Sequence, residues 1–182
     1  NLVKLSSHQI NEDESAKAAQ MLRIIGDFER IADHAVNLLE SAEELKDKGI
    51  TFTETANAEL KVLTDAVLEI ANLSLNSFEN NDLNAAFDIE PLEEIIDRLK
   101  EKLRTNHIVR LQQGKCSIDA GFVWLDLLTN LERTSDHCSN IGSCMIETSH
   151  HNLNMHESMR IIKSESEYFK EKYVFYSEKY KL

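Results

Sequence analysis

The chain has 182 residues, a net charge of −12, five glycines and one proline. This acidity argues against a surface that binds nucleic-acid phosphate or anionic lipid. Three cysteines without CxxC spacing argue against a zinc ribbon or a disulfide framework, and we expect Cys138 and Cys144 in the core. No apolar run approaches the ~20 residues that span a bilayer, and no secretory leader is visible, so we expect these residues to form a soluble unit.

The scarcity of helix breakers predicts long helices joined by short connections. Hydrophobic spacing places them at about 11–48, 53–80, 82–112, 117–149 and 154–180. We expect Asn11 to cap the first helix, Gly49 to end it, and Thr51 or Thr53 to cap the second. Pro91 should kink or split the third. The sequence therefore predicts an all-α antiparallel bundle of about five helices.

The remaining boundaries come from turn residues. Asp82 follows two asparagines and should cap the third helix, Gly114 should end it, and Ser117 should cap the fourth. The last helix carries several aromatic residues, which we expect to pack against the bundle instead of binding a ligand. This tail extends beyond the part of the chain that contains the motif described next.

The first and fourth predicted helices are copies of one motif. Residues 22–38 align without gaps on residues 125–141, at an offset of 103 residues. Six of the seventeen aligned positions are identical and five of those six are polar. A shared amphipathic pattern would preserve apolar positions first, so the kept polar residues indicate an internal duplication. Residues 3–7 likewise resemble 109–113, which suggests that Asn1 lies near the end of a helix equivalent to the third one.

Each copy places two acids four residues apart on one helix, Glu29 with Asp33 and Glu132 with Asp136. With about 100° between successive residues, each pair lies on one stripe. In the first copy we expect this stripe to border a buried face made of a set of five apolar residues: Ile25, Phe28, Ala32, Val36 and Leu39. Acids at this spacing repel each other unless a cation lies between them, so the stripe favours a metal site.

The third predicted helix adds another such pair, Glu93 and Asp97. If the third and fourth helices pack antiparallel, these two acids could converge with Glu132 and Asp136. Four carboxylates suit Fe, Mn, Mg or Ca, and Zn is also compatible. The motif's histidines, His34 and His137, lie about 100° from the paired Asp and are better placed to hydrogen-bond between helices.

Three other interpretations of these residues are considered. The acids can simply be hydrated, with the adjacent Glu29-Arg30 and Glu132-Arg133 supporting ion pairs between helices. A di-iron carboxylate enzyme would need two Glu-x-x-His pairs from different helices, whereas the chain offers only one at a helix end, Glu147 with His150. A helical adaptor without metal is the third alternative, and no nucleophile–base pair or phosphate loop points to a hydrolase.

The duplicated Glu-Arg-x-x-Asp-His-x-x-Asn motif at 29–37 and 132–140 resembles the metal-binding helices of the PhoU family. The resemblance covers residues 1–150 and implies a spectrin-repeat-like bundle without enzymatic activity, which binds iron or zinc clusters and regulates phosphate uptake. It implies a metal-ligand role for six acids, namely Glu29, Asp33, Glu93, Asp97, Glu132 and Asp136. The resemblance also implies a partner for the protein, either a phosphate transporter membrane domain or a transport or sensor complex.

Two departures from the family pattern stand out. The first repeat lacks the acids of its own second helix, so the Glu29/Asp33 half-site is expected to be incomplete and a metal to bind the second copy first. The tail at 151–182 lies outside the family's core. A truncated PhoU unit followed by such a Tyr-rich terminal helix resembles the cytoplasmic C-terminal region of bacterial sodium/phosphate cotransporters. A chain beginning inside a repeat fits that context, at the cytoplasmic face of a membrane. The alternative is a free-standing PhoU-type regulator, and a homodimer is compatible with either.

Overall fold

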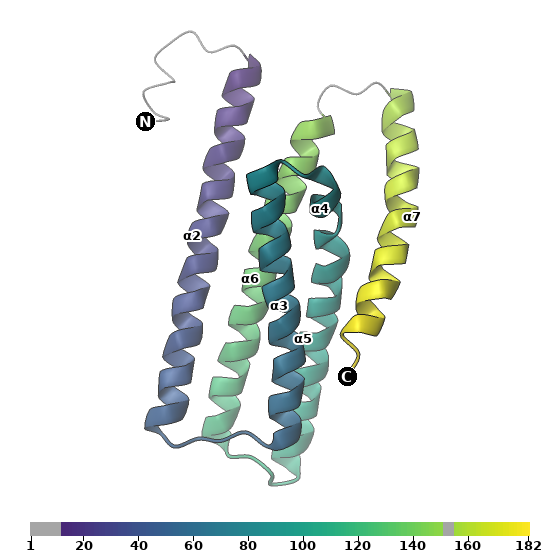
Figure 1. The fold of residues 1–182 in the computed structure, drawn as a ribbon. Coiled ribbons are helices and arrows are strands. Elements are labelled where there is room, and N and C mark those ends of the chain that lie inside the picture. Colours follow the sequence, from purple (N-terminus) through teal and green to yellow (C-terminus); the bar gives the residue numbers. More distant parts are fainter. Residues whose placement is uncertain (1–11, 151–154) are drawn as a thin grey trace.

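Five long helices and one short helix make up the computed structural model, which describes residues 12–150 and 155–182 (Figure 1). The helices are α2 (Glu12–Asp47), α3 (Glu54–Asn80), α4 (Leu83–Phe87), α5 (Ile89–Gln112), α6 (Ile118–His150) and α7 (Met155–Lys179). The described residues contain no strand. The all-α prediction is therefore confirmed. Within the same residues, none of the helices combines the length and apolar character needed to span a bilayer.

Several predicted helix ends are confirmed by their cap geometry. The Thr53 hydroxyl accepts a hydrogen bond from the Ala56 amide at 3.2 Å, so Thr53 and not Thr51 caps α3. Asp82 and Ser117 cap the following helices in the same way. Gly49 ends α2 at φ +62°, a left-handed conformation that glycine adopts without steric cost. The Asn11 cap and the 3–7 resemblance lie outside the described residues.

Pro91 splits the third predicted helix, but the break lies three residues before it. Asp88 separates the short α4 from α5 and acts as the α5 cap position. Pro91 therefore falls in the first turn of α5. Backbone N–H groups in the first turn have no carbonyl acceptor within the helix, so the lack of an N–H in proline costs no hydrogen bond there. Asp88 also contacts α7, because the Tyr168 hydroxyl and the Lys172 ammonium both donate hydrogen bonds to its carboxylate.

The main core lies between α3, α5, α6 and α7. Trp124 at its centre is fully buried, among residues such as Leu63, Leu92 and Leu103. Two tail aromatics, Tyr176 and Tyr180, are buried in the same core, as the sequence predicted. Cys138 and Cys144 are also buried and free, which confirms their expected place.

Helix α2 lies at one edge of the bundle and α7 at the other (Figure 1). Among residues 14–47 of α2, whose side chains the structure describes, Ile24 and Ser41 are buried, and Ile24 packs with Ile141 and Met145 of α6. Phe28 makes an edge-to-face contact with Phe78 of α3. α6 is thus the helix that holds α2 along its length.

The prediction of which face of α2 is buried is wrong. Ile25, Val36 and Leu39 are 51%, 54% and 60% exposed, Ala32 is exposed and Phe28 is only partly buried. Helix α2 carries two apolar stripes, and α6 covers the one that begins at Ile24. That stripe is interspersed with polar side chains which hydrogen-bond to α6, and periodicity alone cannot anticipate those bonds.

Candidate metal centre

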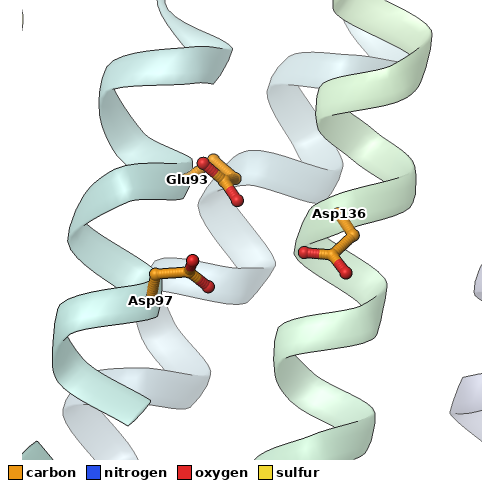
Figure 2. Close-up of side chains that lie close together, drawn as sticks. All are labelled: Glu93, Asp97 and Asp136. Atoms are coloured by element: carbon orange, nitrogen blue, oxygen red, sulfur yellow. The ribbon is translucent and has the colours of Figure 1, made fainter. Parts of the chain in front are cut away.

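Helices α5 and α6 pack antiparallel and bring two acidic pairs to one side of the bundle. Glu93 and Asp97 are one turn apart on α5, and Asp136 faces them from α6 (Figure 2). One oxygen of each carboxylate lies within 4.8 Å of the other two. Three of the four acids that the sequence placed here therefore converge as predicted.

The cluster is polar at its rim and apolar beneath. Leu92 and Ile96 of α5, which flank Glu93 and Asp97 in sequence, are fully buried, as is Ser135 beside Asp136. This fixes the rotation of both helices, so the acids are held at the edge of the core. On α6 the predicted relation between the acids and the buried face is confirmed, because Leu128 and Leu131 are buried there.

The carboxylates of the cluster are short of positive charge. Within the described part of the chain, neither Glu93 nor Asp97 forms an ion pair. Asp136 is paired with Arg133 at 3.2 Å, a contact on its own helix. Burial, followed by the charges of Asp97 and Glu90, raises the pKa of Glu93 to about 7.

Burial also raises the pKa of Asp97, with Glu132 and Asp136 adding to the effect. The pKa of Asp136 is raised by burial first and by the charge of Glu132 second, against the opposing charge of Arg133. All three groups therefore hold their protons more tightly than free carboxyls do. A bound cation would relieve the same repulsion, and three carboxylate oxygens suit a hard or borderline metal ion.

The fourth predicted ligand, Glu132, is close to the cluster but is engaged elsewhere. Its carboxylate accepts a hydrogen bond from the Lys100 ammonium at 3.0 Å, and its side chain is 16% exposed. Lys100 follows Asp97 by three residues and so lies on the same side of α5. The sequence analysis missed Lys100, although its spacing from Asp97 was the available signal.

The first motif copy is placed differently. Glu29 and Asp33 are exposed on α2, and Asp33 forms an ion pair with Arg30 at 3.6 Å. No other described helix contributes an acid to them, since the described residues contain one group of three metal-ligating side chains, the cluster at Glu93.

The histidine and asparagine residues that both motif copies share lie at the α2–α6 contact. His34 Nδ1 is 2.9 Å from the Asn130 side-chain oxygen, and His137 Nδ1 is 2.9 Å from an Asp27 carboxylate oxygen. The two imidazoles stack at 5.6 Å between ring centroids. The prediction that these histidines hydrogen-bond between helices is confirmed.

The hydrogen bonds at this contact follow the internal repeat. Asp27 and Asn130 are separated by the same 103 residues that separate the two histidines. The amide of Asn37 donates to Asn130 at 3.0 Å, and that of Asn140 donates to Asp27 at 3.4 Å. Each motif copy thus donates to the equivalent residue of the other copy, which gives the pair an approximate two-fold relation. The sequence analysis assigned no role to Asp27 or Asn130.

Comparison with known proteins agrees with this duplicated arrangement. The family described as the PhoU domain matches residues 1–42 and 60–145. These stretches contain both motif copies and the Glu93 cluster. The chain belongs to the PhoU domain family. The match ends at residue 145, before α7 begins.

Two curated relatives carry the PhoU name. The phosphate-specific transport system accessory protein PhoU homolog 1 of Thermotoga maritima is 29% identical over 149 residues, which are 81% of this chain and 62% of that protein. A PhoU homolog with the same accessory-protein name from Borreliella burgdorferi is 29% identical over 131 residues, 69% of this chain and 57% of that protein. The chain thus spans about three-fifths of these relatives. No solved structure matches it significantly.

Proposed function

We propose that this PhoU-family chain is a non-enzymatic, cytoplasmic regulator of phosphate transport whose working site is a metal ion held by Glu93, Asp97 and Asp136. The observation that carries this proposal is the convergence of three carboxylates that lack a cationic partner from another helix. Membership of the PhoU family supplies the phosphate-transport context, since both curated relatives are named accessory proteins of such a system.

The donor set narrows the choice of metal. All three atoms are carboxylate oxygens, which suit Fe, Mn, Mg or Ca and are compatible with Zn. Glu132 would complete a four-carboxylate site if its side chain turned from Lys100 to the metal. A bound ion would bridge α5 and α6 and so fix their relative rotation. Occupancy would then be coupled to the shape of the bundle that a transport complex contacts.

Elemental analysis of the purified, untagged chain tests the metal site. We expect wild type to retain about one ion or more per chain, and the triple variant Glu93→Gln, Asp97→Asn, Asp136→Asn to lose it. A matched control, Glu29→Gln with Asp33→Asn, removes two carboxylates from the exposed motif copy and should retain the metal. Equal loss in both variants, or substoichiometric metal in wild type, would contradict the proposal.

Phosphate uptake by cells of the source organism tests the regulatory role separately. Replacing the chromosomal copy with the triple variant should change phosphate uptake under phosphate-replete growth. The Glu29→Gln, Asp33→Asn control should leave it unchanged. Unaltered uptake in the triple variant would mean that this site does not act in transport regulation, even if it binds metal.

A second candidate is the cytoplasmic part of a sodium/phosphate cotransporter. The observation that favours it is α7, which follows the PhoU region and is anchored to it through Asp88 and through Glu69, the acceptor of Lys179 and Tyr180. Sequencing the gene upstream of Asn1 discriminates the two. Apolar segments of ~20 residues there would favour the cotransporter, and a further PhoU-type repeat would favour the free-standing regulator.

A further inference from the structure

A groove of about 480 Å³ opens between α6 and α7, beside the short helix α4 (Figure 1). Volumes of this size are typical of sites that hold small organic molecules. Side chains of α4, α5, α6 and α7 line the groove, so it exists only in the assembled bundle. None of the three acids of the metal cluster is among the lining residues. We call this space the α6–α7 groove.

The walls of the α6–α7 groove are held by close contacts. A Cβ atom added to Gly142 of α6 would lie 2.9 Å from the Ile89 side chain at the start of α5. The two helices therefore approach this closely only because residue 142 has no side chain. On the other wall, Tyr168 and Lys172 of α7 both bond to Asp88 at the α4–α5 junction. These contacts preform the groove, which lowers the cost of ordering it around a ligand.

The lining of the groove combines apolar rings with carboxylates. Phe87 of α4, Ile146 of α6 and Phe169 of α7 supply apolar surface, and each is partly buried. Glu90 of α5 and Glu147 of α6 are exposed at the same groove. Apolar surface favours an organic group, while aromatic faces and carboxylates both attract positive charge. A ligand with an apolar body and a cationic group satisfies both parts of this lining.

The existing partners of the two carboxylates leave them able to bind a cation. Glu90 accepts a hydrogen bond from the Ser139 hydroxyl at 2.6 Å, a neutral donor, and it forms no ion pair within the part of the chain that the structure describes. Glu147 pairs with Arg23 at 3.3 Å, and these side chains are 67% and 54% exposed. Exposed pairs of this kind contribute little free energy. Glu90 is therefore the stronger attractor of a cationic group.

We propose that the α6–α7 groove binds a small organic cation, an alkylated ammonium ion with an aromatic or aliphatic body. The apolar body lies against Phe87, Ile146 and Phe169, and the ammonium group lies at Glu90 with Glu147 beside it. The net charge of −12 raises the local concentration of cations around the whole molecule. An anion of the same size is repelled by the same carboxylates.

Glu90 also connects the groove with the acidic cluster. It precedes Glu93 by three residues, about one helical turn, and its charge already acts on Glu93. A cation at Glu90 would repel a metal ion held by Glu93. By linkage, each ligand should weaken the binding of the other by the same factor. This coupling rests on the proposed metal function, whereas binding in the groove does not.

Isothermal titration calorimetry of the full chain with benzyltrimethylammonium, in EDTA, tests the groove. We expect saturable binding to wild type, weakened about tenfold by Glu90→Gln with Glu147→Gln. Ser143→Trp introduces a large side chain into the groove from an exposed position of α6 and should abolish binding. The control Glu40→Gln with Glu43→Gln removes the same charge from exposed positions of α2 and should bind like wild type. Circular dichroism checks that every variant keeps its helices.

Several results would overturn the groove proposal: no saturable binding to wild type, equal weakening in the control pair, full binding to Ser143→Trp, or equal affinity for the anion 3-phenylpropionate. Titration with Mn²⁺ in place of EDTA tests the coupling. Once Mn²⁺ is shown to bind, the affinity for benzyltrimethylammonium should fall, and an unchanged affinity would overturn the coupling. Failure of Mn²⁺ to bind would count against the metal site and leave the result for the groove in EDTA as it stands.

Discussion

Several influences disfavour the charged form of Glu93: partial burial first, then the charges of Asp97 and Glu90 on its own helix, and the charge of Asp136 on the facing helix. With a pKa of about 7, this carboxyl exchanges its proton near neutral pH. Protons and metal ions therefore compete for the same oxygen atoms. Metal affinity should fall steeply as the pH drops below about 7.

The stability of the metal-free protein should depend on pH through this residue. The folded-state pKa of Glu93, about 7, lies above the ordinary value of 4.5. Between these values the folded state binds the proton more tightly than the unfolded state. The corresponding stability is therefore fully present below about pH 4.5 and is lost as the pH rises through about 7. Urea denaturation at about pH 6 and about pH 8 should show a drop.

Glu93→Gln should reduce that drop but not abolish it, because the pKa values of Asp97 and Asp136 are raised in the same direction. Glu40→Gln offers a control, since Glu40 is exposed on α2 and is not among the charges that act on Glu93. If both substitutions flatten the pH dependence equally, the cluster is not its source.

Lys100 limits the site to three carboxylates. Its ammonium holds Glu132 and adds a positive charge beside Asp97. Lys100→Met should free Glu132 and tighten binding of a divalent metal about tenfold, equivalent to ~1.4 kcal/mol. Competition titration against a chelator measures the change. Lys102→Met, which removes a charge from an exposed position of the same helix, should have little effect, and tighter binding there would point to net charge alone.

At the scale of the helix, the kept polar residues of the motif serve two different surfaces. Glu132 and Asp136 of α6 face α5, and Glu29 and Asp33 are exposed on α2, while His and Asn of both copies bond across the α2–α6 contact. The repeat in the sequence predicted that these residues matter. It could not predict which stripe of α2 is buried, because both stripes have helical spacing and the choice depends on hydrogen-bond partners 93 to 113 residues away.

A second polar contact ties three helices together at the other end of the bundle. Arg110 of α5 forms an ion pair with Glu59 of α3 at 2.7 Å, and both residues are buried. The Arg110 guanidinium also lies over the Trp124 ring of α6 at 5.2 Å. Removing one partner of such a largely buried pair is costly, because the other charge is left without its partner in a poorly hydrated site.

Arg110→Met should destabilise the fold by ~3 kcal/mol, because the Glu59 carboxylate would remain buried with only a hydrogen bond from Asn106. Thermal or urea unfolding measures this loss. Arg104→Met removes an exposed partner of Glu101 on the same helix and should cost less than ~1 kcal/mol. Similar losses of unfolding free energy for both variants would mean that the buried Arg110–Glu59 pair contributes no more stability than an exposed pair.

For the whole molecule, the sequence predicted the class, the five long helices and most of their caps, since these follow from local spacing and turn chemistry. It also predicted that α5 and α6 would share an acidic site, because antiparallel neighbours bring their stripes together. Engagement of Glu132 by Lys100 and the exposure of Ile25 and Leu39 were not predicted. Both outcomes depend on which side chains come into contact when the helices pack. The hydrophobic periodicity of a single helix does not contain that information.

The pairing of α2 with α6 also bears on how the protein is made. Gln20 of α2 donates to the Cys144 carbonyl of α6, a contact across 124 residues. Ribosomes add about 5–20 residues per second, so α2 waits roughly 6–25 s for this partner after it leaves the exit tunnel. During that interval the apolar stripe that begins at Ile24 lacks its α6 partner. The first long helix of this segment to be synthesised is therefore among the last to be secured, and it is the natural place for a chaperone to bind the nascent chain.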